Sequence, residues 1–81
     1  MSVNDLVTEL VLLLLEVDAD DLGPDTILEE VGNWDSINQL RLLTRLEQKL
    51  SATIDIEEFA AVVTFADLVR LASRTADAAG R

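Results

Sequence analysis

Apolar residues recur every three or four positions near the start of the chain, which is the spacing of one face of an α-helix. These positions, after Val3, are Leu6, Val7, Leu10, Leu13, Leu14 and Val17. Ser2 and Asp5 stand three residues apart in front of this run and form a capping signal. The pattern predicts a first helix over about residues 3–17.

A second helical pattern covers residues 36–50. One face of it holds Gln39 and five leucines: Leu40, Leu42, Leu43, Leu46 and Leu50. Three basic residues occupy the opposite side: Arg41, Arg45 and Lys49. Ser36 and Gln39 have the spacing of a capping box at the helix start, while Ile37 falls off the apolar stripe on the Arg41 side. We therefore predict a helix over residues 36–50 with its leucines facing the core.

Residues 18–35 separate these two helices and show no periodicity. They contain a cluster of turn-forming residues at positions 20–25, so we predict a long connection. Connections of this length are uncommon in small domains and are often functional. Four apolar side chains are expected to hold it against the helices: Ile27, Leu28, Val31 and Trp34.

The last third of the chain predicts one short helix and one long helix. Residues 54–56 look extended or turn-like and lead into a short helix near residues 57–61. Thr64 and Asp67 form a capping signal for a last helix that reaches about Ala78. Its inward residues are predicted to be Phe65, Leu68, Val69, Leu71 and Ala72. No strand pattern competes, so we expect an all-α fold, a small bundle of three main helices plus one short helix, in a single domain over residues 1–81.

The composition excludes most of the common types of catalytic site. The 81 residues include no cysteine and no histidine, which excludes disulfides, Ser-His and Cys-His catalysis, and His/Cys zinc sites. Four residues match positions 1, 3, 6 and 12 of a calcium-binding loop: Asp18, Asp20, Gly23 and Glu29. Leu22 at the fifth position offers no ligand and Pro24 stands at the seventh. We therefore predict no metal site.

The net charge of −10 is distributed unevenly. Residues 1–35 hold no Lys or Arg and ten acids: Asp5, Glu9, Glu16, Asp18, Asp20, Asp21, Asp25, Glu29, Glu30 and Asp35. Residues 36–81 hold six acids and six bases. We expect no nucleic-acid partner because its phosphates would be repelled, and a basic protein partner fits better.

No segment of the sequence has the properties of a membrane anchor or a secretory signal. The longest apolar run, residues 10–15, is far shorter than the roughly 20 residues that cross a bilayer. No basic region precedes that run, as a secretory signal would require. We therefore expect no membrane partner and a cytoplasmic location.

Ser36 is the candidate for chemistry, because it stands where the connection ends and the second helix begins. Ser and Asp are common helix caps, so one interpretation of Asp35-Ser36 is capping alone. The other is that Asp35 caps the helix by itself and leaves the Ser36 hydroxyl pointing outward. The start of a helix also favours an attached anion.

Residues 34–43 resemble the Asp-Ser-Leu signature of acyl and peptidyl carrier proteins. Other segments that fit the same family are residues 25–32, 46–47, 54–56 and 64–68, so the resemblance covers essentially the whole chain. Two departures are small: Ile37 replaces the commoner leucine, and Asn33 lies between Gly32 and Trp34.

The resemblance implies a stand-alone, non-catalytic carrier. A phosphopantetheinyl transferase would use coenzyme A and magnesium to join a 4'-phosphopantetheine arm to Ser36, and Asp35 would belong to the same motif. The arm's thiol would carry an acyl or aminoacyl group as a thioester. Implied partners are a loading enzyme (an adenylation enzyme or an acyltransferase) and downstream condensing or transfer enzymes, and we expect a monomer.

The resemblance also implies partner-binding residues near Ser36. In carrier proteins the position of Ile37 helps to dock partners and to shield the arm, although Ile37 could equally be an ordinary exposed residue. The predicted partner-binding residues are Trp34, Ile37, Leu40, Arg41 and Arg45. Trp34 is also expected to anchor the connection.

The basic residues Arg41, Arg45 and Lys49 lie four apart, a spacing that costs roughly 0.2–0.5 kcal/mol per like-charge pair in an isolated helix. Acids of residues 18–30 could neutralise them, or they could form a stripe presented to partners. Fatty-acid carriers generally have an acidic second helix. This stripe therefore favours a specialised pathway of the polyketide or nonribosomal peptide type over fatty-acid synthesis.

Several alternatives stay open. The cargo could be aminoacyl, peptidyl or polyketide, since the loading enzyme chooses it, and a fatty-acid carrier remains the alternative within the family. A helical interaction adaptor with no prosthetic group is the alternative from another class. A hydrolase that uses Ser36 fails for want of a base.

Overall fold

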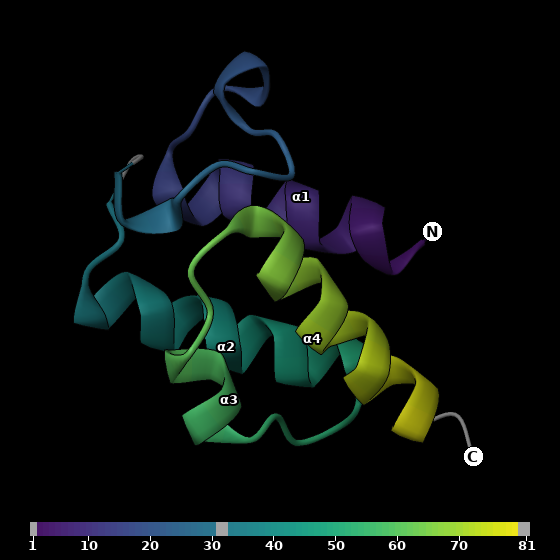
Figure 1. Ribbon diagram of the computed structural model, residues 1–81. Coiled ribbons are helices and arrows are strands. Elements are labelled where there is room, and N and C mark those ends of the chain that lie inside the picture. Colours follow the sequence, from purple (N-terminus) through teal and green to yellow (C-terminus); the bar gives the residue numbers. More distant parts are fainter. Residues whose placement is uncertain (1, 31–32, 80–81) are drawn as a thin grey trace.

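Two long helices that run side by side in opposite directions form the base of the fold, and a third long helix packs against both (Figure 1). The computed structural model describes residues 2–30 and 33–79. Its helices are α1 (Val3–Leu15), α2 (Ser36–Leu50), α3 (Ile56–Ala60) and α4 (Phe65–Ala79). Short 3-10 turns η1 (Ala19–Asp21) and η2 (Leu28–Glu30) lie in the connection between α1 and α2. The predicted all-α bundle with one short helix is confirmed.

Local side-chain hydrogen bonds set the helix starts. The Ser2 hydroxyl accepts the backbone N–H of Asp5 at 3.1 Å, as the first capping signal predicted. At α4, the Thr64 hydroxyl accepts the N–H of Asp67 at 3.2 Å, and the Asp67 carboxylate accepts the N–H of Thr64 at 3.1 Å. This reciprocal pair is a capping box, so the α4 prediction is confirmed as well.

The first helix ends two residues earlier than predicted. Glu16 adopts a left-handed conformation with φ 54°, and α1 therefore stops at Leu15. Val17 continued the apolar pattern, and it is buried although it lies outside the helix. The chain turns at Glu16 and still contributes its next apolar side chain to the core.

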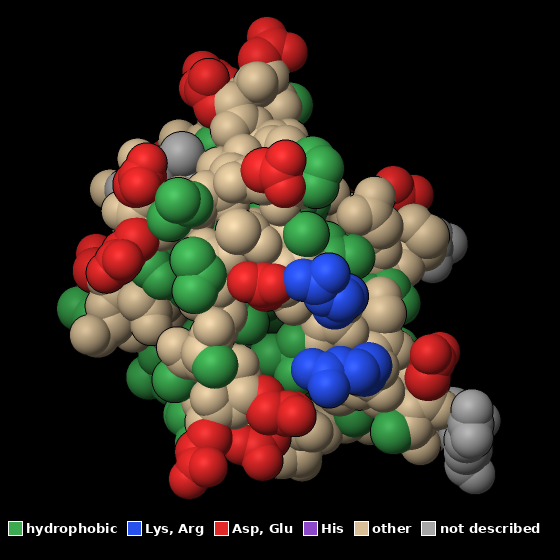
Figure 2. All heavy atoms as spheres, in the orientation of Figure 1, with side chains coloured by type: hydrophobic (Ala, Val, Ile, Leu, Met, Phe, Trp, Pro, Cys, Tyr) green, Lys and Arg blue, Asp and Glu red, His purple; other side chains and the backbone are tan. Residues whose placement is uncertain are grey.

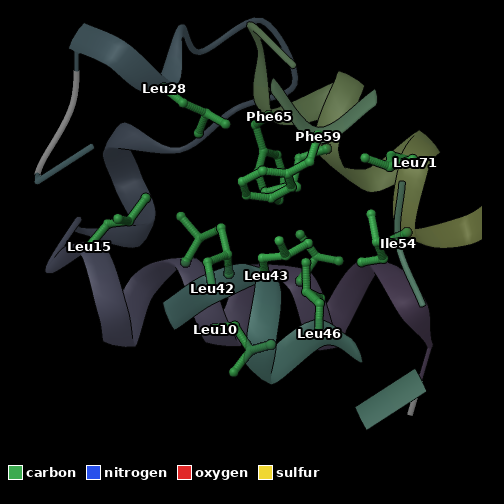
Figure 3. Packing of buried hydrophobic residues seen from close by; sticks show 14 of the residues in the cluster. Leu10, Leu15, Leu28, Leu42, Leu43, Leu46, Ile54, Phe59, Phe65 and Leu71 are labelled. Carbon is green, nitrogen blue, oxygen red and sulfur yellow. The ribbon is translucent and has the colours of Figure 1, made fainter. Parts of the chain in front are cut away.

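The core lies between α1, α2 and α4, and Figure 3 shows its side chains pointing toward one another. Leu42, Leu43 and Leu46 supply the inner face of α2. The prediction that Leu40 also faces inward is wrong, because its side chain is 60% exposed. The inner face of α2 is centred on Leu46, and Leu40 lies about a third of a turn away from that line.

The connection also contributes Leu28 to this core. Leu28 is fully buried and points from the connection toward the interior in Figure 3. Its backbone N–H donates to the carbonyl of Val63 at 3.0 Å, which fixes the connection to the segment before α4. Ile27 was expected to pack inward too, but it is 37% exposed. Val31 lies outside the described residues.

Candidate functional site

Asp35, and not Ser36, caps α2. The Asp35 carboxylate accepts the backbone N–H of Asn38 at 2.8 Å, and its backbone is extended, with φ −109° and ψ 173°. Ser36 is the first residue of the helix itself. The predicted capping box between Ser36 and Gln39 is therefore wrong, since the Gln39 side-chain amide instead donates to the carbonyl of Trp34 at 3.5 Å.

The Ser36 side chain is exposed, and its hydroxyl forms no hydrogen bond with any residue in the described part of the chain. The helix behind it has 15 residues, so its aligned peptide dipoles favour negative charge at this end. The N–H of Ile37 also finds no acceptor among residues 2–30 and 33–79, since it belongs to the first turn, where no preceding helical carbonyl is available. A phosphodiester on the Ser36 oxygen would thus meet a backbone donor and no competing side chain.

Asn33 connects the segment before Ser36 to both α1 and α2 through hydrogen bonds. Its backbone N–H donates to the carbonyl of Leu15 at 3.4 Å, and its side-chain amide donates to a Glu16 carboxylate oxygen at 3.4 Å. Its own carbonyl accepts the side-chain amide of Asn38 at 3.0 Å. The end of α1 and the start of α2 are therefore linked through one residue. In the sequence Asn33 stands out only as a departure from a family pattern, because its partners at the end of α1 are distant in sequence.

Trp34 lies half-buried beside α3, with its ring centroid 6.1 Å from that of Phe59. This contact anchors the last part of the connection, as predicted from its apolar character. A hollow of about 260 Å³ opens next to it, lined by Glu29, Trp34, Gln39, Ala60, Val62 and Val63. The start of α2 therefore borders a concave surface that three separate segments build.

Four of the five predicted partner-binding residues are exposed on α2. Ile37 is 66% exposed and Leu40 is 60% exposed, and the side chains of Arg41 and Arg45 are exposed as well. Each of these four lies one to four residues from the next along the helix, and all four fall within a little over a third of its circumference, so they share one side of α2. Trp34 stands apart from them, packed on Phe59.

The acids of residues 18–30 do not neutralise the bases of α2. In the described residues no ion pair involves Arg41, Arg45 or Lys49. The arginines of α4 differ, since Arg70 pairs with Asp67, and Arg74 lies 3.8 Å from Glu58. On the face shown in Figure 2, basic side chains gather over α4 with acidic side chains beside them.

The pKa of Asp67 is lowered by hydrogen bonds that cap α4, and none of them involves Ser36. Backbone hydrogen bonds from Thr64 and Val63, with a further bond from Arg70, lower the pKa of this carboxyl to about 2. These bonds favour the ionised form because they donate to its oxygens. The residues involved all lie at the start of α4, so the shift reports a strong helix cap.

The described residues contain no group of three or more His, Cys, Asp or Glu side chains placed to hold a metal ion. No helix within residues 2–30 and 33–79 combines the length and the apolar character needed to cross a membrane. The expected cytoplasmic location stays a prediction.

A small all-α bundle with an exposed serine at the start of its second helix has the architecture of a carrier domain. The chain matches the family model described as a phosphopantetheine attachment site over residues 5–72. It therefore belongs to this family of acyl and peptidyl carrier proteins, whose members carry a covalently attached 4'-phosphopantetheine. Such carriers interact with a phosphopantetheinyl transferase and with partner enzymes, and they are generally non-catalytic. A search of curated protein sequences found no match to the chain.

Proposed function

We propose that Ser36 is the residue that carries the arm, and that the chain presents a tethered acyl or aminoacyl intermediate to enzymes of a specialised biosynthetic pathway. The observation that carries the proposal is that two neighbouring residues at the start of α2 have different roles. Asp35 satisfies the helix end, and the hydroxyl of Ser36 is exposed. Modification of Ser36 would therefore leave the Asp35 cap in place.

The residues of the chain position the arm and supply no catalysis of its transfer. The Ser36 oxygen forms the new bond to phosphorus, the nucleotide part of coenzyme A leaves, and the serine proton passes to a base on the transferase. The chain has no histidine to act as that base. When bound, the arm supplies a thiol that holds the cargo as a thioester. Tethering raises the effective concentration of the cargo at each partner enzyme.

The charge of α2 supports a specialised pathway rather than fatty-acid synthesis. The chain resembles carriers in its motif, but fatty-acid carriers generally present an acidic second helix. Here three bases, Arg41, Arg45 and Lys49, are exposed on α2. Enzymes that recognise an acidic helix would meet the wrong charge at this surface.

The test is the intact mass of the protein after incubation with coenzyme A, magnesium and a broad-specificity phosphopantetheinyl transferase. We expect a single phosphopantetheine increment on the wild type and none on Ser36→Ala. Ser51→Gly is the matched control. Ser51 is exposed at the other end of α2, and its φ of 52° suits glycine. This variant should be modified like the wild type.

Two results would overturn the assignment. An increment that persists on Ser36→Ala would place the arm on another residue. No increment on wild-type protein that is folded by circular dichroism, with this transferase and with one from the source organism, would favour an adaptor without a prosthetic group. Such an adaptor should keep its function in Ser36→Ala, because it needs no free serine.

A further inference from the structure

One exposed side of α2 has a composition that the attachment of an arm does not explain. We define the basic face as Leu40, Arg41, Thr44, Arg45 and Lys49, which are all exposed. A hollow of about 400 Å³ opens on this face, lined by Leu14, Leu40, Arg41, Thr44 and Arg45. Leu14 comes from α1, so the hollow lies between two helices. Its floor is apolar and its rim is basic.

The charges of the basic face are available to a partner. Neither Arg41, Arg45 nor Lys49 forms an ion pair with any residue the structure describes. Arg70 and Arg74 on α4 provide a contrast within the same molecule, because both are paired with acids. Like charges four residues apart destabilise a helix, and here no described acid offsets their repulsion. An external anion would offset it.

We infer that the basic face binds an acidic surface of a partner enzyme. The partner would place an apolar side chain between Leu14 and Leu40 and carboxylates opposite Arg41 and Arg45. The inference rests on the proposed function in one respect, namely that the partner acts on the cargo held at Ser36. The rest follows from charge complementarity and from the apolar hollow between the two helices.

The remainder of the surface selects a protein over other anions. The chain carries ten acids and no bases in residues 1–35, so an extended polyphosphate or an anionic membrane that reached beyond the basic face would be repelled by other parts of the chain. Arg41 and Lys49 are eight residues apart, which is about 12 Å along a helix. A compact acidic patch on a protein fits that length. Leu40 adds an apolar anchor for which a nucleic acid backbone has no counterpart.

The position of the basic face would also orient the partner. Ser36 precedes Arg41 by five residues, or about 7.5 Å along the axis of α2. A partner docked on the basic face would therefore have the arm at one end of the contact. The acids elsewhere on the chain would disfavour other orientations of an acidic partner, which gives the encounter a preferred direction.

The test uses isotope-labelled whole protein and a defined probe, a short helical peptide of glutamate and leucine. A matched peptide has lysine in place of glutamate. At low salt we expect the acidic peptide to shift the amide signals of the basic face and of Leu14. The double variant Arg41→Gln/Arg45→Gln should bind it about tenfold more weakly. Arg70→Gln/Arg74→Gln removes the same net charge from α4 and should bind it within about twofold of the wild type. Melting curves check that both variants fold.

Three results would overturn the inference: shifts that fall on α4 rather than α2, an equal loss in the two double variants, or tighter binding of the lysine peptide at the basic face. Single-stranded DNA and phosphatidylglycerol vesicles serve as further probes. If either bound this face more tightly than the acidic peptide, a phosphate surface would be the occupant and the inference would fail.

The same samples separate this inference from the proposed function. Ser36→Ala cannot take the arm, but it keeps the basic face, so it should bind the acidic peptide like the wild type. Absence of the mass increment on the wild type, with normal peptide binding, would count against the role of Ser36 alone. A normal increment with no peptide binding at α2 would count against the basic face alone.

Discussion

The carboxylate of Asp35 accepts the backbone N–H of Asn38 at 2.8 Å, and this bond caps α2 without the hydroxyl of Ser36, which has no hydrogen-bond partner among the described residues. The arrangement separates stability from chemistry at adjacent positions. Asp35 stabilises the helix start, and Ser36 presents an exposed oxygen there. The two roles can therefore be tested independently.

The Asp35 cap should be measurable in the free energy of unfolding. Asp35→Ala should lose about 1 kcal/mol, because the N–H of Asn38 loses its acceptor. Asp35→Asn should lose less, since the amide oxygen can still accept this bond. Urea denaturation of both variants, with Ser36→Ala as the control, gives the comparison. If Ser36→Ala costs as much as Asp35→Ala, then Ser36 shares the cap and the separation of roles is wrong.

Truncation of two leucines of α2 should change the stability of the protein to very different extents. Leu46 is fully buried, so Leu46→Ala should destabilise the protein by about 2–5 kcal/mol through lost contacts and a cavity. Leu40 is 60% exposed, so Leu40→Ala should change stability by no more than about 0.5 kcal/mol. Alanine and leucine have similar helix propensities, which makes the pair well matched. Equal losses in thermal or urea unfolding would show that the helix is rotated relative to this structure.

The connection between α1 and α2 should depend on Leu28 more than on its neighbour Ile27. Leu28 is fully buried although it lies in a 3-10 turn, and Leu28→Ala should cost about 2–5 kcal/mol. Ile27 is 37% exposed, so Ile27→Ala should cost less than half as much. Chemical denaturation of the two variants checks the ranking. The opposite order would mean that the connection packs through Ile27.

The Asp67 cap should make the protein sensitive to acid. The pKa of Asp67 is lowered to about 2 by backbone hydrogen bonds from Thr64 and Val63, while the ordinary value is 3.8. A carboxyl whose folded pKa is lowered contributes stability that is present above its ordinary pKa and is lost as the pH falls toward the folded value. We therefore expect part of the stability to disappear between about pH 5 and pH 2.

Urea denaturation across that range is the measurement for the Asp67 prediction. Asp67→Asn should flatten the dependence on pH, because its amide does not titrate. Asp77→Asn is the control on the same helix, since Asp77 is exposed and forms no side-chain hydrogen bond to the described residues. It should follow the wild type. A wild-type profile that Asp67→Asn leaves unaltered would refute a stabilising role for this cap.

Salt should stabilise the protein. Residues 1–35 hold ten acids and no bases, and only two ion pairs are found across the described residues. Repulsion among exposed carboxylates is screened when the Debye length falls from about 30 Å at low salt to about 8 Å at physiological ionic strength. The melting temperature should therefore rise with sodium chloride over this range. A melting temperature that fell with added salt would contradict the prediction.

Most of the local structure was predictable because its causes lie within a few residues. The caps at Ser2 and Thr64 each join residues three apart, so their signals are visible in the sequence. The range predicted for α2, about residues 36–50, agrees with the structure, because the Asp35-Ser36 step and the apolar pattern that ends at Leu50 are local signals. The carrier resemblance rests on the same short segments, and the family match over residues 5–72 confirms it.

The sequence by itself determined that the chain forms three long helices and a short one, and that a serine beside an acid opens the second. It did so because helix periodicity and capping are local. Only the tertiary structure decided that Leu40 faces outward, that Leu28 is fully buried while Ile27 is not, and that Asn33 links the end of α1 to the start of α2. The hollow on the basic face also exists only in three dimensions, because Leu14 and Leu40 lie far apart in the sequence. A helical wheel gives the angles between side chains on one helix, but burial depends on where the neighbouring helices lie.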